Sequence, residues 1–104
     1  MEVPTLIGAG EAVSHLHGWA ALNGRDAITK SFRFATFEAA FAFMSEVAIV
    51  AVWMQHTPEW TNIAERVDIV LSTGKPQGVT DKDLNLAFAI EAAAKASLPN
   101  QGSH

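Results

Sequence analysis

The sequence predicts an α+β fold in which an antiparallel sheet is covered by helices on one face. Two observations support this prediction. Strand-like alternation of apolar and polar residues occurs in two separate regions, and each region is followed by a long stretch with helical spacing. The order along the chain is a hairpin, a helix, a strand and a helix. At 104 residues there is room for one hydrophobic core, so we expect a single domain over residues 1–104.

The first two strands are predicted between Trp19 and Phe34, on either side of Asn23-Gly24. This dipeptide readily supplies the positive φ angles of a tight hairpin turn. In the second strand the residues of one face are Ile28, Phe32 and Phe34, and those of the other are Ala27, Thr29, Ser31 and Arg33. We therefore expect a β-hairpin with one buried side. Before it, residues 1–10 should be irregular and residues 11–16 should form a short helical turn.

The longest predicted element is a helix that begins after an N-cap at Thr36 and ends near Met54. Residues at helical spacing along it are Phe37, Phe41, Met44, Ala48 and Ala51, and the opposite flank is nearly as apolar, with Phe43, Val47, Val50, Val52 and Trp53. A helix that is apolar almost all round must be covered on more than one side. We expect the sheet to cover one side and a second copy of the chain another, in a homodimer or homotetramer.

A further strand is predicted over residues 62–73, with Val67, Ile69 and Leu71 facing inward. Residues 74–78 contain two glycines and a proline and are expected to form a loop. Thr80 and Asp83 have the spacing of a capping box, which predicts the start of a last helix that fades before Pro99. We treat residues 99–104 as a tail.

Composition excludes several classes of function. The net charge is −4, and the sequence contains no run of basic residues. We therefore expect neither nucleic acid nor a membrane surface as a partner. There is no cysteine, hence no disulfide or thiolate chemistry. His15, His17 and His104 lack metal-ligand spacing, and we expect no metal and no cofactor. Without a signal sequence or a charge-free segment of membrane-spanning length, the chain is expected to be cytoplasmic, with the nucleus as the alternative.

The segment from Gln55 to Trp60 is the strongest candidate for a small-molecule site. His56 follows a long apolar helix and precedes Pro58, a helix-stopping residue, and an indole lies close behind. Histidine suits acid–base chemistry because its unperturbed pKa is about 6.5. Each residue also has a purely structural interpretation: His56 as the end of a helix, Trp60 as a core aromatic.

Several separated blocks of this sequence resemble the pterin-4a-carbinolamine dehydratases. The blocks are Asn23 to Ile28, Phe37 to Met44, His56-x-Pro58-Glu59-Trp60-x-Asn62, Val67-x-Ile69-x-Leu71-Ser72-Thr73 and Gly78-x-Thr80-x-x-Asp83-x-x-Leu86-Ala87. The resemblance implies a four-stranded antiparallel sheet with helices on one face, assembled into dimers or tetramers. It also implies the dehydration of 4a-hydroxytetrahydrobiopterin to quinonoid dihydrobiopterin.

The resemblance also implies which residues form the site. Of three histidines typical of the family, only His56 is present, because Thr57 and Gly74 occupy the other two positions. Two further family positions, an acidic or polar residue and an aromatic one, are Val52 and Ala64. The implied catalytic residues are His56 and Thr57, and the implied substrate-binding residues are Gln55, Trp60, Ser72, Thr73 and Asp83. Ser72 and Thr73 alternatively only end a strand, and Asp83 alternatively only caps a helix.

Two functions therefore follow as alternatives. One is a pterin-4a-carbinolamine dehydratase whose acid–base set is reduced. The other is a non-catalytic member of the family that acts as an assembly or dimerisation cofactor for another protein, because some animal members of the family serve as dimerisation cofactors for a transcription factor. A pterin is the partner in the first case and a protein is the partner in the second.

Overall fold

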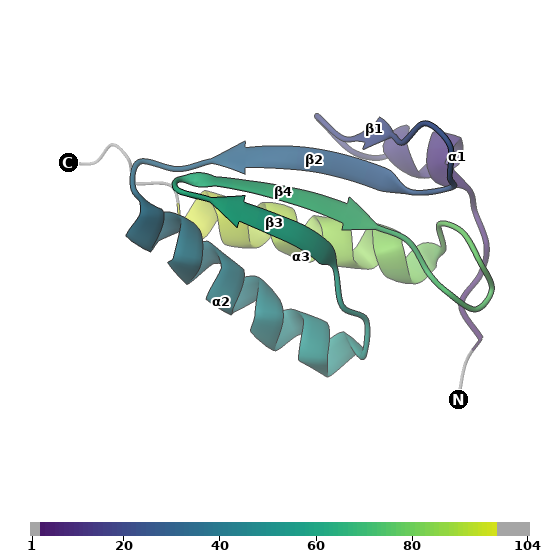
Figure 1. Ribbon diagram of the computed structural model, residues 1–104. Helices are drawn as coiled ribbons and strands as arrows, with labels where there is room; N and C mark the ends of the chain where they lie inside the picture. Colours follow the sequence, from purple (N-terminus) through teal and green to yellow (C-terminus); the bar gives the residue numbers. More distant parts are fainter. Residues whose placement is uncertain (1–2, 98–104) are drawn as a thin grey trace.

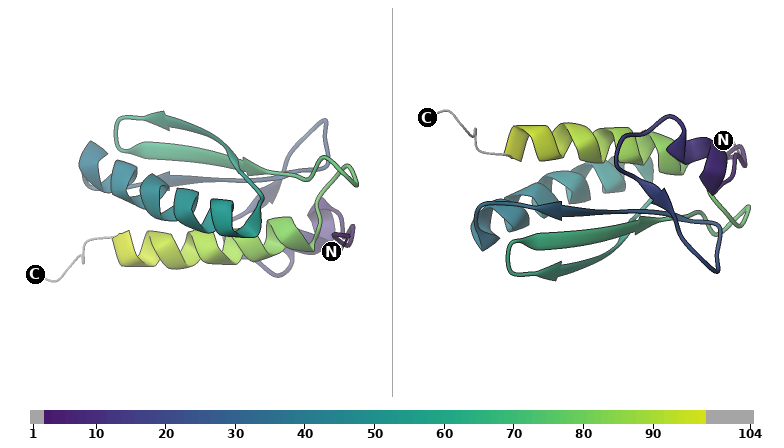
Figure 2. Two further views of the ribbon diagram at one scale, coloured as in Figure 1. Left: turned by 90° about the horizontal axis from the view of Figure 1, so that it is seen from below. Right: turned by 90° about the horizontal axis from the view of Figure 1, so that it is seen from above.

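A computed structural model of the chain describes residues 3–97 and has the predicted α+β architecture. Its elements are α1 (Ala9–Val13), β1 (Ala20–Ala21), β2 (Ile28–Arg33), α2 (Phe37–Met54), β3 (Glu59–Ile63), β4 (Arg66–Leu71) and α3 (Asp81–Ser97). The four strands form one antiparallel sheet in the order β1-β2-β4-β3. The long helices α2 and α3 lie side by side on one face of it (Figures 1 and 2). The expected tail, residues 99–104, lies outside the described residues.

The first hairpin is confirmed, but its turn is longer than a two-residue turn. The Leu22 N–H donates to the Ala27 carbonyl at 2.9 Å and closes a loop over residues 23–26, in which Gly24 has a φ of 89°. The predicted inner face is buried as expected, at Ile28, Phe32 and Phe34. Ala27, which we expected to face outward, is instead fully buried. Strand pairing begins only at Ile28, so the alternation of faces does not extend back to Ala27.

The region predicted as one strand over residues 62–73 is a second hairpin. β3 and β4 pair from Ile63 with Arg66, so only two residues, Ala64 and Glu65, connect them. Ala64 has a φ of 52°, a conformation that favours glycine or asparagine, so the sequence contains no obvious turn signal. The Asn62 side-chain amide stabilises the turn by donating to the carbonyls of Ala64 and Arg66, each at 3.0 Å. The inward-facing residues of β4 were predicted correctly.

Helix α2 has the predicted bounds, and the Thr36 hydroxyl accepts a hydrogen bond from the Ala39 N–H at 3.0 Å as its N-cap. Its core face consists of Ala40, Phe43, Val47 and Ala51. Phe43 stacks on Phe34 with ring centroids 4.8 Å apart. Phe37 and Phe41, from the apolar stripe of our prediction, are exposed in the single chain. Together with Ile49, Val52 and Trp53 they form an exposed apolar surface on α2, which we call the α2 outer face.

Among the described helices, α2 is the one long and apolar enough to cross a membrane by length and composition alone, with a mean hydropathy of 1.6. A core helix passes the same test, and one face of α2 does lie in the protein core, packed against α3 and the sheet. We therefore interpret α2 as a packing helix of this domain. Its outer face is then the feature that needs a partner.

Candidate functional site

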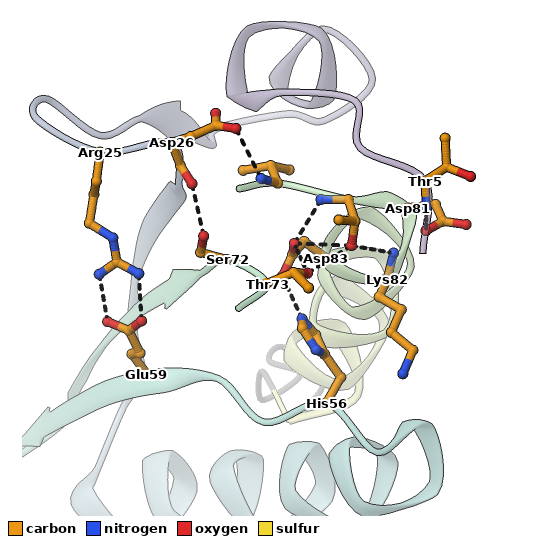
Figure 3. Close-up of polar contacts among 12 residues, drawn as sticks. Thr5, Arg25, Asp26, His56, Glu59, Ser72, Thr73, Asp81, Lys82 and Asp83 are labelled. Atoms are coloured by element: carbon orange, nitrogen blue, oxygen red, sulfur yellow. Dashed lines mark hydrogen bonds and ion pairs between the residues drawn. The ribbon is translucent and has the colours of Figure 1, made fainter. Parts of the chain in front are cut away.

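The end of α2 determines where the candidate histidine lies. Gln55 adopts a left-handed conformation (φ 55°, ψ 45°), and its N–H donates to the Val52 carbonyl at 3.1 Å. The N–H of His56 donates to the Ala51 carbonyl at 3.0 Å. This pair of bonds satisfies carbonyls in the last turn of the helix and stops it. The chain then leaves the helix axis, and the imidazole of His56 points toward the start of α3 (Figure 3).

His56 is held by a buried carboxylate. Its Nε2 lies 2.5 Å from Oδ1 of Asp83. The side chain of His56 is only 11% exposed, and that of Asp83 is completely buried. Charge-assisted hydrogen bonds of this kind are short and strong. With Asp83 as a carboxylate, Nε2 is the donor, so the ring orientation is fixed and Nδ1 is left to exchange a proton.

The other oxygen of Asp83 completes a polar cluster. Oδ2 accepts hydrogen bonds from the Thr73 hydroxyl at 2.7 Å and from the Thr80 N–H at 2.8 Å. The Thr80 hydroxyl lies 2.7 Å from that of Thr73 and accepts from the Lys82 N–H at 3.2 Å. The predicted helix cap is therefore confirmed, and a carboxylate is favourable at this position because of the helix dipole. Asp83 serves as cap and as the partner of His56 at once.

A cavity of about 530 Å³ lies beside this cluster. It is formed by the loop between β1 and β2, the start of β3 and the chain that follows β4. Its lining residues are Gly24, Arg25, Asp26, Glu59, Ser72, Thr73, Gly74 and Gln77. Thr73 belongs both to the cavity wall and to the buried cluster, so this residue joins the two. The ring of His56 is not part of the lining.

Charged groups dominate one side of the cavity. Arg25 donates two parallel hydrogen bonds to Glu59, from Nη1 to Oε1 at 2.9 Å and from Nη2 to Oε2 at 2.7 Å (Figure 3). The hydrogen bonds from Arg25 lower the pKa of Glu59 below its usual value, and the same pair raises the pKa of Arg25. Glu59 is therefore ionised near neutral pH.

Asp26, also in the lining, has a structural role. Its Oδ1 accepts from the Ala9 N–H at 2.7 Å and its Oδ2 from the Val79 N–H at 3.1 Å. It thus ties the start of α1 and the chain before α3 to the first hairpin. A Cβ at Gly78 would collide with Oδ2 of Asp26, and the φ of Gly78 is 130°. Only glycine fits at this close approach.

The structure brings together four of the seven residues predicted for the site. His56, Thr73 and Asp83 share one hydrogen-bonded cluster, and Ser72 joins Thr73 in the cavity wall, where its hydroxyl donates to the Asp26 carbonyl at 2.8 Å. Gln55 and Thr57 are exposed and lie outside the cavity lining.

Trp60 pairs across the sheet with Ile69 and packs against the hydrophobic core, so it has the structural role considered above, and its stacking on a ligand stays a prediction. The sequence interpretation missed Arg25 and Glu59, although both lie inside the blocks that carry the family resemblance. Nothing local indicates that side chains 34 positions apart form an ion pair.

Comparisons with known proteins identify the family. A family model described as pterin 4 alpha carbinolamine dehydratase matches residues 8–93. A protein of Paraburkholderia xenovorans is 50% identical over 80 residues, which cover 77% of this chain and 83% of the relative. One from Burkholderia multivorans is 48% identical over 87 residues, covering 84% and 85%. Both carry the provisional name pterin-4-alpha-carbinolamine dehydratase.

Two solved structures share the fold. A transcriptional coactivator/pterin dehydratase from Brucella melitensis is 40% identical, superposes with a TM-score of 0.82, and matches 86% of this chain and 99% of its own. A pterin dehydratase-like protein, described as a RuBisCO assembly factor in the alpha-carboxysome, superposes with a TM-score of 0.65 over 77% of this chain and 93% of its own. At 20% identity, the second likeness concerns the fold alone.

Proposed function

The chain belongs to the pterin 4 alpha carbinolamine dehydratase family, and from this premise we propose that it dehydrates 4a-hydroxytetrahydrobiopterin to quinonoid dihydrobiopterin. The observation that carries the proposal is the hydrogen-bonded cluster of His56, Asp83 and Thr73 beside a cavity. A buried, oriented imidazole that is linked to a polar cavity through hydrogen bonds, here by way of Asp83 and Thr73, is an arrangement suited to general acid–base catalysis. The provisional names of the relatives support the same activity.

The reaction requires two proton transfers. An acid protonates the 4a-hydroxyl group, the C4a–O bond breaks, and the oxygen leaves as water with the bonding electron pair. A base removes the proton from N5, and its electron pair forms the N5–C4a double bond. We assign the proton transfers to Nδ1 of His56, because Asp83 fixes Nε2 and so holds the ring in one orientation. Thr73, a residue of the cavity wall, donates its hydroxyl to Asp83 and so helps to hold the carboxylate that orients His56.

The proposed enzyme is slower than a member with the full set of family histidines. Thr57 and Gly74 stand at the two other histidine positions. Threonine does not act as a base near neutral pH, and glycine offers only its backbone. Each positioned acid–base group contributes about 10²- to 10⁴-fold to the rate, although groups that act as one unit are not additive. We therefore expect a measurable but reduced acceleration.

The test is the rate at which the 4a-hydroxy intermediate disappears in the presence of purified protein. Wild type should accelerate this step, and His56→Ala should remove the acceleration. His15→Ala is the matched control, because His15 is an exposed histidine paired with Glu11 on α1 and should leave the rate unchanged. Equal rates with and without the wild-type protein would overturn the proposal.

A second candidate function is supported by a separate observation, the α2 outer face. Its members Phe37, Phe41, Ile49, Val52 and Trp53 are large and exposed, with Trp53 83% exposed. Exposed apolar surface of this kind marks a site of protein association. In this alternative the chain is a non-catalytic assembly or dimerisation cofactor for another protein. The Brucella melitensis relative, described as a transcriptional coactivator as well as a dehydratase, supports a protein-directed role.

Titration with dihydrobiopterin separates the two candidates. Saturable binding, followed by calorimetry, supports the enzyme. The cofactor is supported if dihydrobiopterin does not bind and another protein copurifies with the chain in stoichiometric amount. That association should then be lost when Trp53 is changed to a charged residue. Trp53 lies on the α2 outer face and is not among the cavity residues, so this change leaves the candidate pterin site intact.

A further inference from the structure

We propose that Glu59 recognises the 2-amino-4-oxopyrimidine edge of the pterin, and that Arg25 covers this carboxylate when no ligand is bound. The inference rests on the proposed function, because it names the contact by which the same site selects its substrate. It concerns an ion pair in the cavity wall that the catalytic role of His56 does not use.

Glu59 accepts hydrogen bonds from two N–H groups that lie side by side. Arg25 presents two N–H groups in parallel to the two oxygens of Glu59, at 2.9 Å and 2.7 Å. The pyrimidine edge of a pterin also presents two N–H groups side by side, one on the 2-amino group and one on N3. A carboxylate pairs in the same bidentate geometry with a guanidinium group and with this edge of a pterin. The guanidinium of Arg25 thus occupies a position that this edge of the ligand fits.

Glu59 is the acidic residue of the cavity wall that is able to exchange its partner. Among the described lining residues, Asp26 is the other carboxylate, and both of its oxygens hold backbone N–H groups, of Ala9 and Val79. Those contacts belong to the fold and are not replaceable by a ligand. The partner of Glu59 is instead a side chain, and both members of the pair are about half exposed. Exposed ion pairs contribute little net stability, so exchange costs little.

The two partners also differ in how firmly the backbone holds them. Glu59 is the first residue of β3 and pairs with Val70 of β4. Arg25 lies in the loop that joins β1 and β2, next to Gly24 with its φ of 89°. The carboxylate is therefore fixed by the sheet, while the guanidinium is placed by a loop and a long side chain. Displacement moves Arg25 and leaves Glu59 in place.

A ligand held at Glu59 extends toward the proposed reacting groups. Glu59 lies opposite Val70, and Ser72 follows Val70 by two residues, so it continues on the same side of the chain. Ser72, Thr73 and Gly74 all line the cavity. The pyrimidine edge therefore binds at one end, and the ring that carries C4a and N5 lies toward Thr73, the residue linked to Asp83 and His56.

The experiment compares the binding of pterin and of lumazine, which carries an oxygen in place of the 2-amino group. Wild type should prefer pterin, because the 2-oxo group of lumazine faces the carboxylate with a lone pair. In Glu59→Gln the affinity for pterin should fall on the order of ten- to a hundredfold, the usual effect of losing hydrogen bonds to a charged group. The preference over lumazine should largely disappear. A purely structural ion pair would not change this preference.

Two variants serve as controls for this titration. Arg25→Ala should bind pterin as tightly as wild type, or up to about fivefold more tightly, because it removes the competing group. Glu65→Gln breaks a comparable exposed pair with Arg33, of 2.9 Å, away from the cavity, and should change nothing. The inference is overturned if Glu59→Gln keeps the wild-type preference for pterin, or if Arg25→Ala weakens binding as much as Glu59→Gln does. Failure of wild type to bind any pterin would instead remove the proposed function itself.

Discussion

Asp83 uses its two oxygens for two different tasks, and this links the helix cap to the candidate catalytic group. Oδ1 binds His56, while Oδ2 binds the N–H of Thr80 and the hydroxyl of Thr73. The spacing of Thr80 and Asp83 predicted the cap, because the two residues are three positions apart. The contact with His56 was not predictable from spacing, because 27 residues separate the two side chains and only the fold brings them together.

The pH dependence of Glu59 provides a prediction at the residue scale. Hydrogen bonds from Arg25 lower its pKa in the folded protein. The stability that this pair contributes is therefore fully present above the ordinary glutamate pKa, about 4.3. It is lost as the pH falls through the lower pKa of the folded state. Carboxyl NMR titration should give a midpoint for Glu59 below the ordinary glutamate value, and Arg25→Ala should raise it. A midpoint unchanged by Arg25→Ala would contradict the ion pair.

At the scale of elements, the sequence predicted the bounds of α2 but not its orientation. Both bounds depend on local features, the Thr36 cap and the apolar run that follows it. The orientation depends on which flank packs, and the helix is apolar on almost every side. Packing of Phe43 on Phe34 selects the flank that includes Ala40 and Val47. The second hairpin escaped prediction for a different reason, because its turn uses Ala64 with a positive φ and no glycine.

The α2 outer face gives the prediction that belongs to this scale. We expect a second copy of the chain to cover it, because each large apolar side chain buried contributes roughly 1.5–3 kcal/mol. Ile49→Glu, at a residue 58% exposed, should therefore dissociate the wild-type oligomer. Light scattering after gel filtration should give a mass near that of one 11.1 kDa chain. Ile63→Glu adds the same charge at an exposed position on β3 and is the control. A monomeric wild type would contradict the expectation.

At the scale of the whole molecule, the antiparallel sheet gathers into one cavity residues from three distant parts of the chain. The loop after β1, the start of β3 and the end of β4 meet at the same end of the sheet (Figure 1). The family resemblance predicted the fold and two of the cavity residues, Ser72 and Thr73. It could not predict the cavity itself, because the positions of Arg25 and Glu59 depend on strand register and loop length.

The cavity also contains the position that most directly tests whether this is a dehydratase site. Gly74 lines the cavity and stands where the family has its third histidine. A Cβ added to Gly74 would meet no atom within 4 Å outside its chain neighbours, so there is room for a side chain. The decisive measurement is the rate of 4a-hydroxytetrahydrobiopterin dehydration by Gly74→His. We predict at least a tenfold increase over wild type, consistent with the usual ~10²- to 10⁴-fold contribution of an acid–base group, and loss of that increase in the double variant with His56→Ala. A Gly74→His protein that binds pterin but dehydrates the intermediate no faster than wild type would contradict the assignment of this cavity as a dehydratase site.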